Sequence, residues 1–149
     1  MKTKILLMLC LFGFFMGCKK SEDPDPRDNY VGSWSLSKLN NKASTSATTI
    51  TVKKETATTA MSINWFDPSL PDYVTLNSSN FTFDEVSILY SSNFVSNGIR
   101  YRVEFENGTG KISGTNLILS FDIKFTNLSN NQVSRSTGSD GWIEEYIKK

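Results

Sequence analysis

The side chains of this 149-residue chain whose spacing suits acid–base chemistry are carboxylates. Glu104 and Glu106 are two residues apart, a spacing that places both side chains on one face of a β-strand. Two carboxylates that flank a cleft are the machinery of glycoside hydrolysis. Arg100 and Arg102 share that face, however, so we expect a solvated surface on which these four charges pair with one another.

The other residue types exclude most remaining catalytic centres. The chain has no histidine, which removes the usual general base and the serine-histidine-aspartate triad. Zinc sites need cysteine or histidine, and residues 30–149 contain neither; no D-x-D-x-D loop is present for calcium. The acidic pairs Asp84–Glu85 and Glu144–Glu145 are adjacent, so their side chains point to opposite faces of a strand. We therefore predict a protein that is not an enzyme and holds neither cofactor nor metal.

The amino-terminal segment has the features of a targeting signal. Lys2 and Lys4 precede an apolar run from Ile5 to Met16, and the small residue Gly17 closes it. This layout is typical of a secretory signal. The run has about a dozen residues, whereas a helix that spans the bilayer core needs roughly 20. Residues 1–17 are therefore predicted to be a signal peptide.

Residues 15–18, Phe-Met-Gly-Cys, resemble the lipobox of bacterial lipoproteins. The resemblance implies that the signal is cut before Cys18, that its sulfur is thioether-linked to diacylglycerol, and that the new amino terminus is acylated, for example by palmitate. Several acyl chains together anchor a protein durably in a membrane. The rival Cys10 leaves too short an apolar run. The alternative is that Cys18 is a free thiol after a conventional signal.

Residues 19–29, KKSEDPDPRDN, contain no apolar side chain except two prolines. Because such a stretch cannot offset its ordering entropy by burial, residues 18–29 are predicted to be a lipidated, flexible acidic stalk. Residues 19–23 resemble the export stretch of lipoproteins on the outer face of the outer membrane, which implies the cell surface; a periplasmic-facing location is the alternative. Without the signal, acidic side chains exceed basic ones by one, so we expect no nucleic-acid partner.

From residue 30 onward the hydrophobic pattern has a period of two. In residues 99–106, IRYRVEFE, and 116–125, NLILSFDIKF, apolar side chains alternate with polar ones, as in strands with one buried face. No segment keeps a helical period. Further strands are expected at 30–39, 48–54, 59–65, 73–76, 80–83, 86–91 and 141–148. One all-β domain over residues 30–149 follows, an antiparallel meander barrel or, alternatively, a β-sandwich.

Turn signals separate the two clearest strands. Asn-Gly, which occurs at Asn107-Gly108, is the strongest kind of short hairpin signal, and Ser113-Gly114 is a weaker one. The glycines of residues 108–114, GTGKISG, could suggest a phosphate cradle, but no helix follows them. We therefore interpret them as turn glycines in a meander of hairpins.

The first strand of the domain contains Gly32 and Trp34 in a G-x-W pattern, which resembles the signature of lipocalin-like barrels. Together with the lipobox and the GTGKISG segment, it is similar to small bacterial lipoproteins with a lipocalin-like domain. The resemblance implies that Trp34 closes one barrel end under an arginine from a late strand. Arg135 lies in a predicted polar loop instead, and the last strand offers only Lys148 and Lys149.

A stretch at residues 64–76, NWFDPSLPDYVTL, holds the candidate contacts for a ligand or partner. Trp65, Phe66 and Tyr73 flank two proline-containing pairs, so the rings could form an exposed platform on a stiff loop. The alternative is a loop pinned by Trp65 and Phe66 tucked into the end of the barrel.

We therefore expect a membrane-anchored lipoprotein whose non-catalytic domain binds a small apolar ligand or a glycan. The alternative is a structural or interaction subunit of a cell-envelope assembly that has no small-molecule ligand. Large inward side chains would fill the barrel and favour the interaction role, whereas small ones would leave a cup. The chain offers large ones: Phe81, Phe83, Phe105, Phe121 and Phe125.

Overall fold

The computed structural model describes residues 23–67, 70–83 and 88–149. The predicted signal peptide, the lipidation site at Cys18 and the pair Asp84–Glu85 lie outside these ranges. None of the helices found within them is long and apolar enough to cross a membrane.

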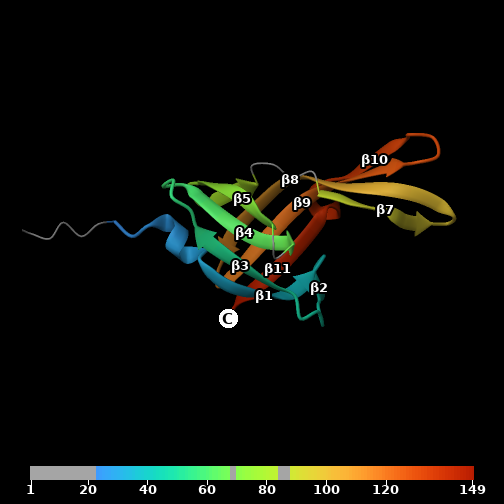
Figure 1. Ribbon diagram of the computed structural model, residues 1–149. Coiled ribbons are helices and arrows are strands. Elements are labelled where there is room, and N and C mark those ends of the chain that lie inside the picture. The colour runs from blue at the N-terminus through green and yellow to red at the C-terminus, as the bar shows by residue number, and fades with distance from the viewer. Residues whose placement is uncertain (1–22, 68–69, 84–87) are drawn as a thin grey trace, which may run out of the picture.

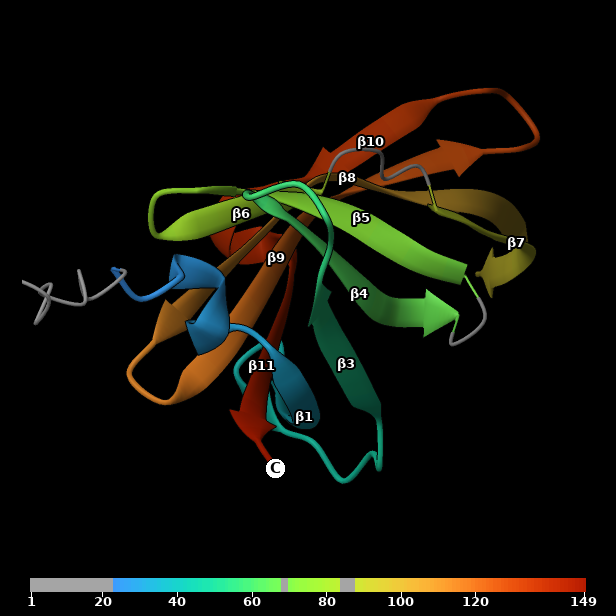
Figure 2. The ribbon, with the colours of Figure 1, turned by 60° about the vertical axis from the view of Figure 1, so that its left-hand side comes forward.

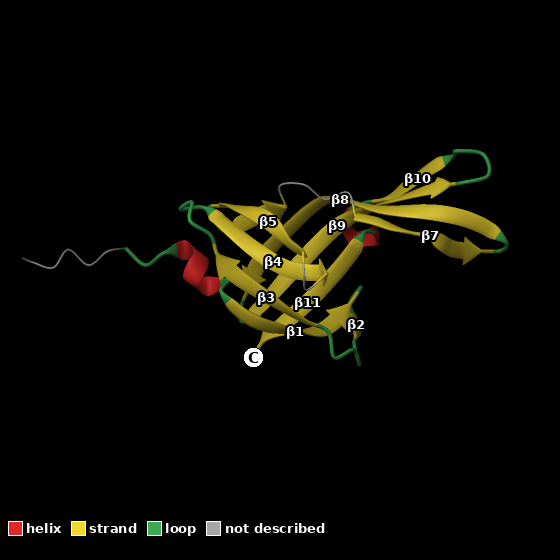
Figure 3. Ribbon diagram, viewed as in Figure 1, coloured by secondary structure: helices red, strands yellow, loops and turns green. Residues whose placement is uncertain are grey.

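The described residues form antiparallel strands and two short 3₁₀ helices (Figures 1 and 3). In chain order the elements are η1 (Pro26–Asn29), β1 (Gly32–Leu39), β2 (Lys42–Ala43), β3 (Thr49–Lys54), β4 (Ala60–Asp67), β5 (Leu70–Asn77), β6 (Asn80–Phe83), β7 (Ile88–Ser96), β8 (Ile99–Ser113), β9 (Asn116–Asn127), β10 (Val133–Ser136), η2 (Gly138–Asp140) and β11 (Trp142–Lys148).

Eight of these strands close into an antiparallel barrel, which confirms the predicted fold class. The ring runs β1-β3-β4-β5-β6-β8-β9-β11, and β11 pairs with β1 to complete it. Neighbours in this ring follow one another along the chain, apart from the short β2 and the side strands β7 and β10. The barrel is therefore a meander, and the sandwich alternative is wrong.

Large apolar side chains from all eight strands fill the barrel. On β9, Leu117, Leu119 and Phe121 are buried, and the intervening residues face outward. Phe81, Phe83 and Phe105 are buried in the same cluster, against which Phe125 packs from a partly buried position. The large side chains expected to point inward at 81, 83, 105 and 121 are therefore buried in this core, and Phe125 is partly buried beside it.

Trp34 lies fully buried inside the barrel. Its Nε1 donates a hydrogen bond of 2.7 Å to the carbonyl oxygen of Tyr30. Lys148 Nζ lies 5.4 Å from the centroid of the Trp34 ring, a cation–π distance. The cation beside the Trp34 ring is therefore a lysine of the last strand. Arg135 lies in β10, not in a loop as predicted, because β10 pairs with the end of β9.

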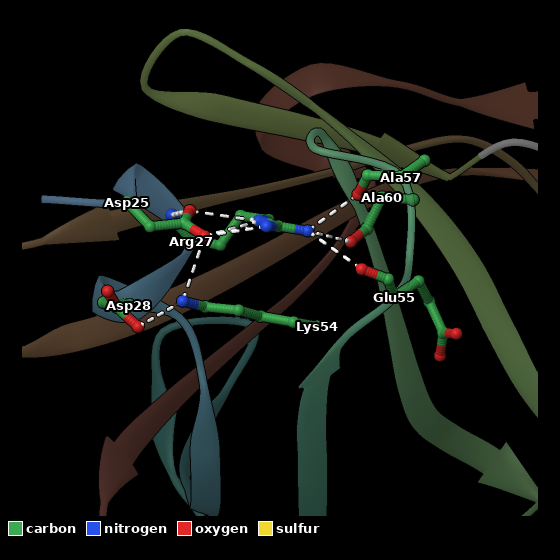
Figure 4. A network of polar contacts seen from close by, with 7 residues as sticks. All are labelled: Asp25, Arg27, Asp28, Lys54, Glu55, Ala57 and Ala60. Carbon is green, nitrogen blue, oxygen red and sulfur yellow. Dashed lines mark hydrogen bonds and ion pairs between the residues drawn. The ribbon is translucent and has the colours of Figure 1, made fainter. Parts of the chain in front are cut away.

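The helix η1 packs against the turn between β3 and β4 (Figure 4). Asp25 caps η1 and binds Arg27, whose guanidinium holds the pKa of that carboxyl far below its usual range. Arg27 Nη1 donates to the carbonyl oxygens of Glu55, Ala57 and Ala60 at 3.1, 2.7 and 3.2 Å. Within the predicted stalk, Asp25, Arg27 and Asp28 therefore contact the barrel, through Lys54 and the carbonyl oxygens of the turn between β3 and β4.

The strong turn signal at Asn107-Gly108 does not form a hairpin. β8 runs through it with a bulge between Glu106 and Thr109, and Asn107 has a φ of +52°. Gly108 and Gly110 are buried because aromatic rings of the core lie directly against them. The prediction that these two are turn glycines is wrong, whereas Gly114 does form the turn between β8 and β9, with a φ of +61°.

Candidate functional site

Beyond the barrel, β8 and β9 continue as an extension of the sheet, and β7 and β10 pair along its two edges. β7 pairs with the first half of β8, β8 with the second half of β9, and β9 with β10. Figures 1 and 2 show these strands projecting from one side of the molecule, while the described chain begins on the opposite side, beside η1. We call β7, residues 99–106 of β8, residues 122–127 of β9, and β10 the extension; where it joins the barrel, Val103, Phe105 and Ile123 on its inner face still pack into the core.

Charged side chains on the outer face of the extension pair across strands. Lys124 Nζ lies 2.8 Å from Glu104 and 3.5 Å from Glu106, and Arg135 Nε lies 3.2 Å from Glu106. The expected pairing of these acids with Arg100 and Arg102 is therefore wrong. Alternate residues of one strand lie about 7 Å apart, whereas directly opposed residues on adjacent strands lie about 5 Å apart, so cross-strand partners are nearer.

The extension projects from one end of the barrel, and we call this end the mouth. A buried carboxylate, Glu144, lies at the mouth. Glu144 Oε2 accepts hydrogen bonds from Trp65 Nε1 at 2.5 Å and from the Tyr146 hydroxyl at 2.6 Å. Glu144 Oε1 accepts one from Trp142 Nε1 at 2.9 Å. Burial, followed by the charge of Glu144, raises the pKa of the Tyr146 hydroxyl far above its usual value. Three neutral donors from two strands thus hold one carboxylate.

Aromatic rings surround this carboxylate. The Trp65 ring stacks on Phe121 with a centroid separation of 4.2 Å and meets Phe105 edge to face at 5.6 Å. Trp142 also meets Phe105 edge to face, with a centroid separation of 5.6 Å. The mouth is therefore a packed aromatic plug, and Glu144 fixes the orientation of both indole rings within it.

The predicted ring platform is not brought together by the structure. Trp65 lies in β4 and is only 9% exposed, whereas Tyr73 lies in β5 and is 56% exposed. Tyr73 pairs with Ser62, so its side chain points to the opposite side of the sheet from Trp65. The side chain of Phe66 lies outside the described part. Among the described candidates, Tyr73 alone is available to a partner.

Asp72 is a second carboxylate directed to the barrel interior. It pairs with Ile63, which in turn pairs with the buried Val52, so all three share the inner face. Within the described residues, Asp72 Oδ2 is buried without a hydrogen-bond partner. Burial raises the pKa of Asp72 above its usual value.

Replacing Asp72 with asparagine is therefore expected to stabilise the fold at pH 7 by roughly 1 kcal/mol, because the neutral amide avoids the cost of burying an unpaired charge. With its folded-state pKa raised, the wild type binds the proton more tightly when folded. It therefore gains stability as the pH falls through the folded pKa towards the unfolded value of about 3.9. Urea denaturation at pH 7 and pH 3.5 should show the advantage of Asp72→Asn shrinking at the lower pH. The exposed Asp140→Asn is the control, and an equal gain for both variants would contradict this account.

A groove of about 360 Å³ lies on the outside of the barrel over β5, β6, β8 and β9. Thr82, Thr109 and Ser120 form one cross-strand row along it. Asn80 and Lys111 pair in the next row. Within the part of the chain that the structure describes, none of these side chains forms a hydrogen bond or ion pair. The groove therefore offers free hydroxyl, amide and ammonium groups.

Sequence reasoning missed Glu144 and Asp72 as candidates. In the sequence, Glu144 was considered only as a member of the adjacent acidic pair Glu144–Glu145. It is, however, two residues away from both Trp142 and Tyr146. That spacing places all three side chains on one face of a strand. An acid between an indole and a phenol donor on the same face was therefore the pattern that could have predicted a buried carboxylate. Asp72 carries no comparable signal, since its inward direction depends on the register with β4.

Comparison with protein-family models, with curated proteins and with solved structures found no match for this chain. Among the described residues, no group of three or more histidine, cysteine, aspartate or glutamate side chains could hold a metal ion. The function must therefore be inferred from the geometry of the chain's own residues.

Proposed function

We propose that the protein is a membrane-anchored lipoprotein whose lipocalin-like barrel is a non-catalytic interaction domain of the cell envelope. It is attached through acylated Cys18 and acts at the outer membrane, on the cell surface. The domain binds a partner protein through its outer surface, and its barrel does not serve as a carrier for a small apolar ligand.

The filled barrel is the observation that carries this proposal. Carriers need a cavity, and ligand pockets that bury a small molecule enclose roughly 300–1,000 Å³. Here Trp34, Phe81, Tyr146 and their neighbours occupy the interior, and the indole rings held by Glu144 plug the mouth. Recognition is therefore assigned to the exterior.

The placement of the extension agrees with an anchored interaction domain. The described chain starts at the η1 side of the barrel, and the extension projects from the other side (Figure 1). A tether at the amino terminus would therefore present the extension away from the membrane, where a partner can reach it.

The anchor is tested first by intact-mass analysis and fractionation of the wild type beside Cys18→Ala, with protease shaving of whole cells. The proposal expects an acyl mass, membrane association and external cleavage for the wild type, and none of these for the variant. The interaction role is tested by detergent solubilisation and purification of the full chain, which should retain one partner at fixed stoichiometry. A soluble wild type with a free thiol, or a chain that purifies alone, would contradict the proposal.

A glycan is a second candidate ligand, favoured by the outer groove. Its free hydroxyl and amide groups match the hydrogen-bonding groups of sugars, and Lys111 would bind an acidic sugar. Binding of uronic-acid oligosaccharides to the purified chain should be measurable by calorimetry and weakened by Lys111→Gln but not by Lys53→Gln on β3. Absence of binding to both acidic and neutral oligosaccharides would reject this candidate.

A further inference from the structure

Two arginines at the far end of the extension have no partner of opposite charge among the residues that the structure describes. Arg100 and Arg102 lie on β8 with exposed side chains, and the described residues provide no ion pair or side-chain hydrogen bond for either. On the same face, Lys124 and Arg135 are both paired with glutamates. The unpaired positive charge of this face is therefore found at the outer end of the sheet.

Exposed apolar side chains flank these arginines. Val95 on β7 is the cross-strand partner of Arg100 and is 56% exposed. Val133 on β10 is 47% exposed and lies in the row of Arg102, with Thr126 between them. The backbone N–H of Leu128 donates to the carbonyl oxygen of Arg100 at 2.9 Å. We call Val95, Arg100, Arg102, Leu128 and Val133 the tip patch.

The composition of the tip patch is that of a protein interface. The buried centre of an interface is more apolar than its rim, and arginine is enriched there and is among the residues that contribute most to binding. Here three of the large hydrophobic side chains exposed in the described ranges gather around two unpaired guanidinium groups. An isolated surface arginine would be ordinary, but this arrangement combines charge with exposed apolar area.

We propose that the tip patch binds an acidic segment of a partner protein in an extended conformation. Arg100 and Arg102 are alternate residues of one strand, so their side chains emerge about 7 Å apart. Carboxylates on alternate residues of an extended segment have the same separation and meet guanidinium groups in charge-assisted hydrogen bonds. Apolar side chains beside those carboxylates contact Val95, Leu128 and Val133. The inference rests on the proposed interaction role and identifies the surface and partner chemistry for it.

The test uses the purified full-length chain and a labelled ten-residue peptide with two glutamates at alternate positions, flanked by valine and leucine. A second peptide has lysine in place of both glutamates. Fluorescence anisotropy should show binding of the glutamate peptide, weakened at least tenfold by Arg102→Glu and by raising the salt to 1 M. Lys53→Glu makes the same charge change at an exposed position on β3 and should alter binding by less than twofold. Equal binding of the two peptides, or full binding by Arg102→Glu, overturns the proposal.

Purification of the same variants from cells separates this inference from the proposed function. Loss of a stoichiometric partner with Arg102→Glu, and its retention with Lys53→Glu, supports the tip patch. Retention of the partner by both variants overturns the tip patch and leaves the interaction role standing, whereas a wild type that purifies alone overturns the interaction role. Self-association of the wild type that Arg102→Glu abolishes would assign the patch to a second copy of the chain and reject the acidic segment.

Discussion

Substitution of Gly110 by alanine is expected to destabilise the barrel by about 3 kcal/mol, the upper end of the range for an overpacked core. A Cβ atom at this position would overlap the ring of Phe81. That ring is fully buried and meets Tyr30 edge to face at 5.4 Å and Phe83 at 5.8 Å, so it has no space into which to move. Chemical denaturation followed by circular dichroism measures the loss.

Two further variants make the Gly110 prediction specific. Gly114→Ala adds the same methyl group at a turn where no heavy atom lies within 4 Å, so its cost is limited to backbone strain of about 1 kcal/mol. Phe81→Leu combined with Gly110→Ala should be more stable than the sum of the two single effects, because the smaller side chain relieves the overlap. Additive effects in the double variant would show that the overlap with Phe81 is not the cause.

The same glycines show what a local pattern can and cannot predict. Asn107-Gly108 and Asn97-Gly98 are the same dipeptide, and both asparagines adopt a positive φ, at +52° and +49°. One dipeptide turns the chain between β7 and β8, while the other forms a bulge within β8. Both asparagines have a left-handed backbone conformation, but only Gly98, with a φ of +77°, continues it as a two-residue hairpin turn requires; Gly108 has no positive φ. The difference arises because aromatic rings from distant strands cover Gly108.

The strand pattern itself was predictable because it follows from burial. The alternation over residues 99–106 and 116–125 determines which side chains face the core, and β8 and β9 contain both segments. The last strand was ambiguous, since Trp142 and Tyr146 lie on one face and Ile143 and Ile147 on the other. Which face is inside depends on the register with β9, where Trp142 pairs with Phe121.

The candidate surfaces depend on register even more strongly. Arg100, Val95 and Val133 come from three strands, and only the pairing of β7, β8, β9 and β10 places them together. β10 was not predicted at all, because residues 133–136 are short and mostly polar. Sequence patterns identify faces of single strands, whereas a surface patch requires the order and offset of several.

Glu144 is expected to be the polar side chain on which the stability of the mouth depends most. Replacing it with alanine leaves the indole N–H groups of Trp65 and Trp142 and the Tyr146 hydroxyl without their acceptor. A buried donor without a partner costs about 1–3 kcal/mol, and members of one network do not add independently. We therefore expect a loss of about 3–5 kcal/mol in the free energy of unfolding, together with a shift in tryptophan fluorescence as the rings become disordered.

Glu145→Ala is the matched control, because it removes the adjacent carboxylate from the outer face. Glu145 forms an ion pair of 2.9 Å with the half-exposed Lys38 and accepts a hydrogen bond from Asn116, so its loss is expected to cost about 1–2 kcal/mol, less than the loss of Glu144. Glu144→Gln keeps one carbonyl acceptor but turns an amide donor towards an indole or phenol donor, so an intermediate loss is expected. Equal effects of Glu144→Ala and Glu145→Ala would mean that the indole orientation does not depend on the buried carboxylate. The closed mouth would then need another explanation. The assignment of recognition to the exterior of the barrel would also lose part of its support.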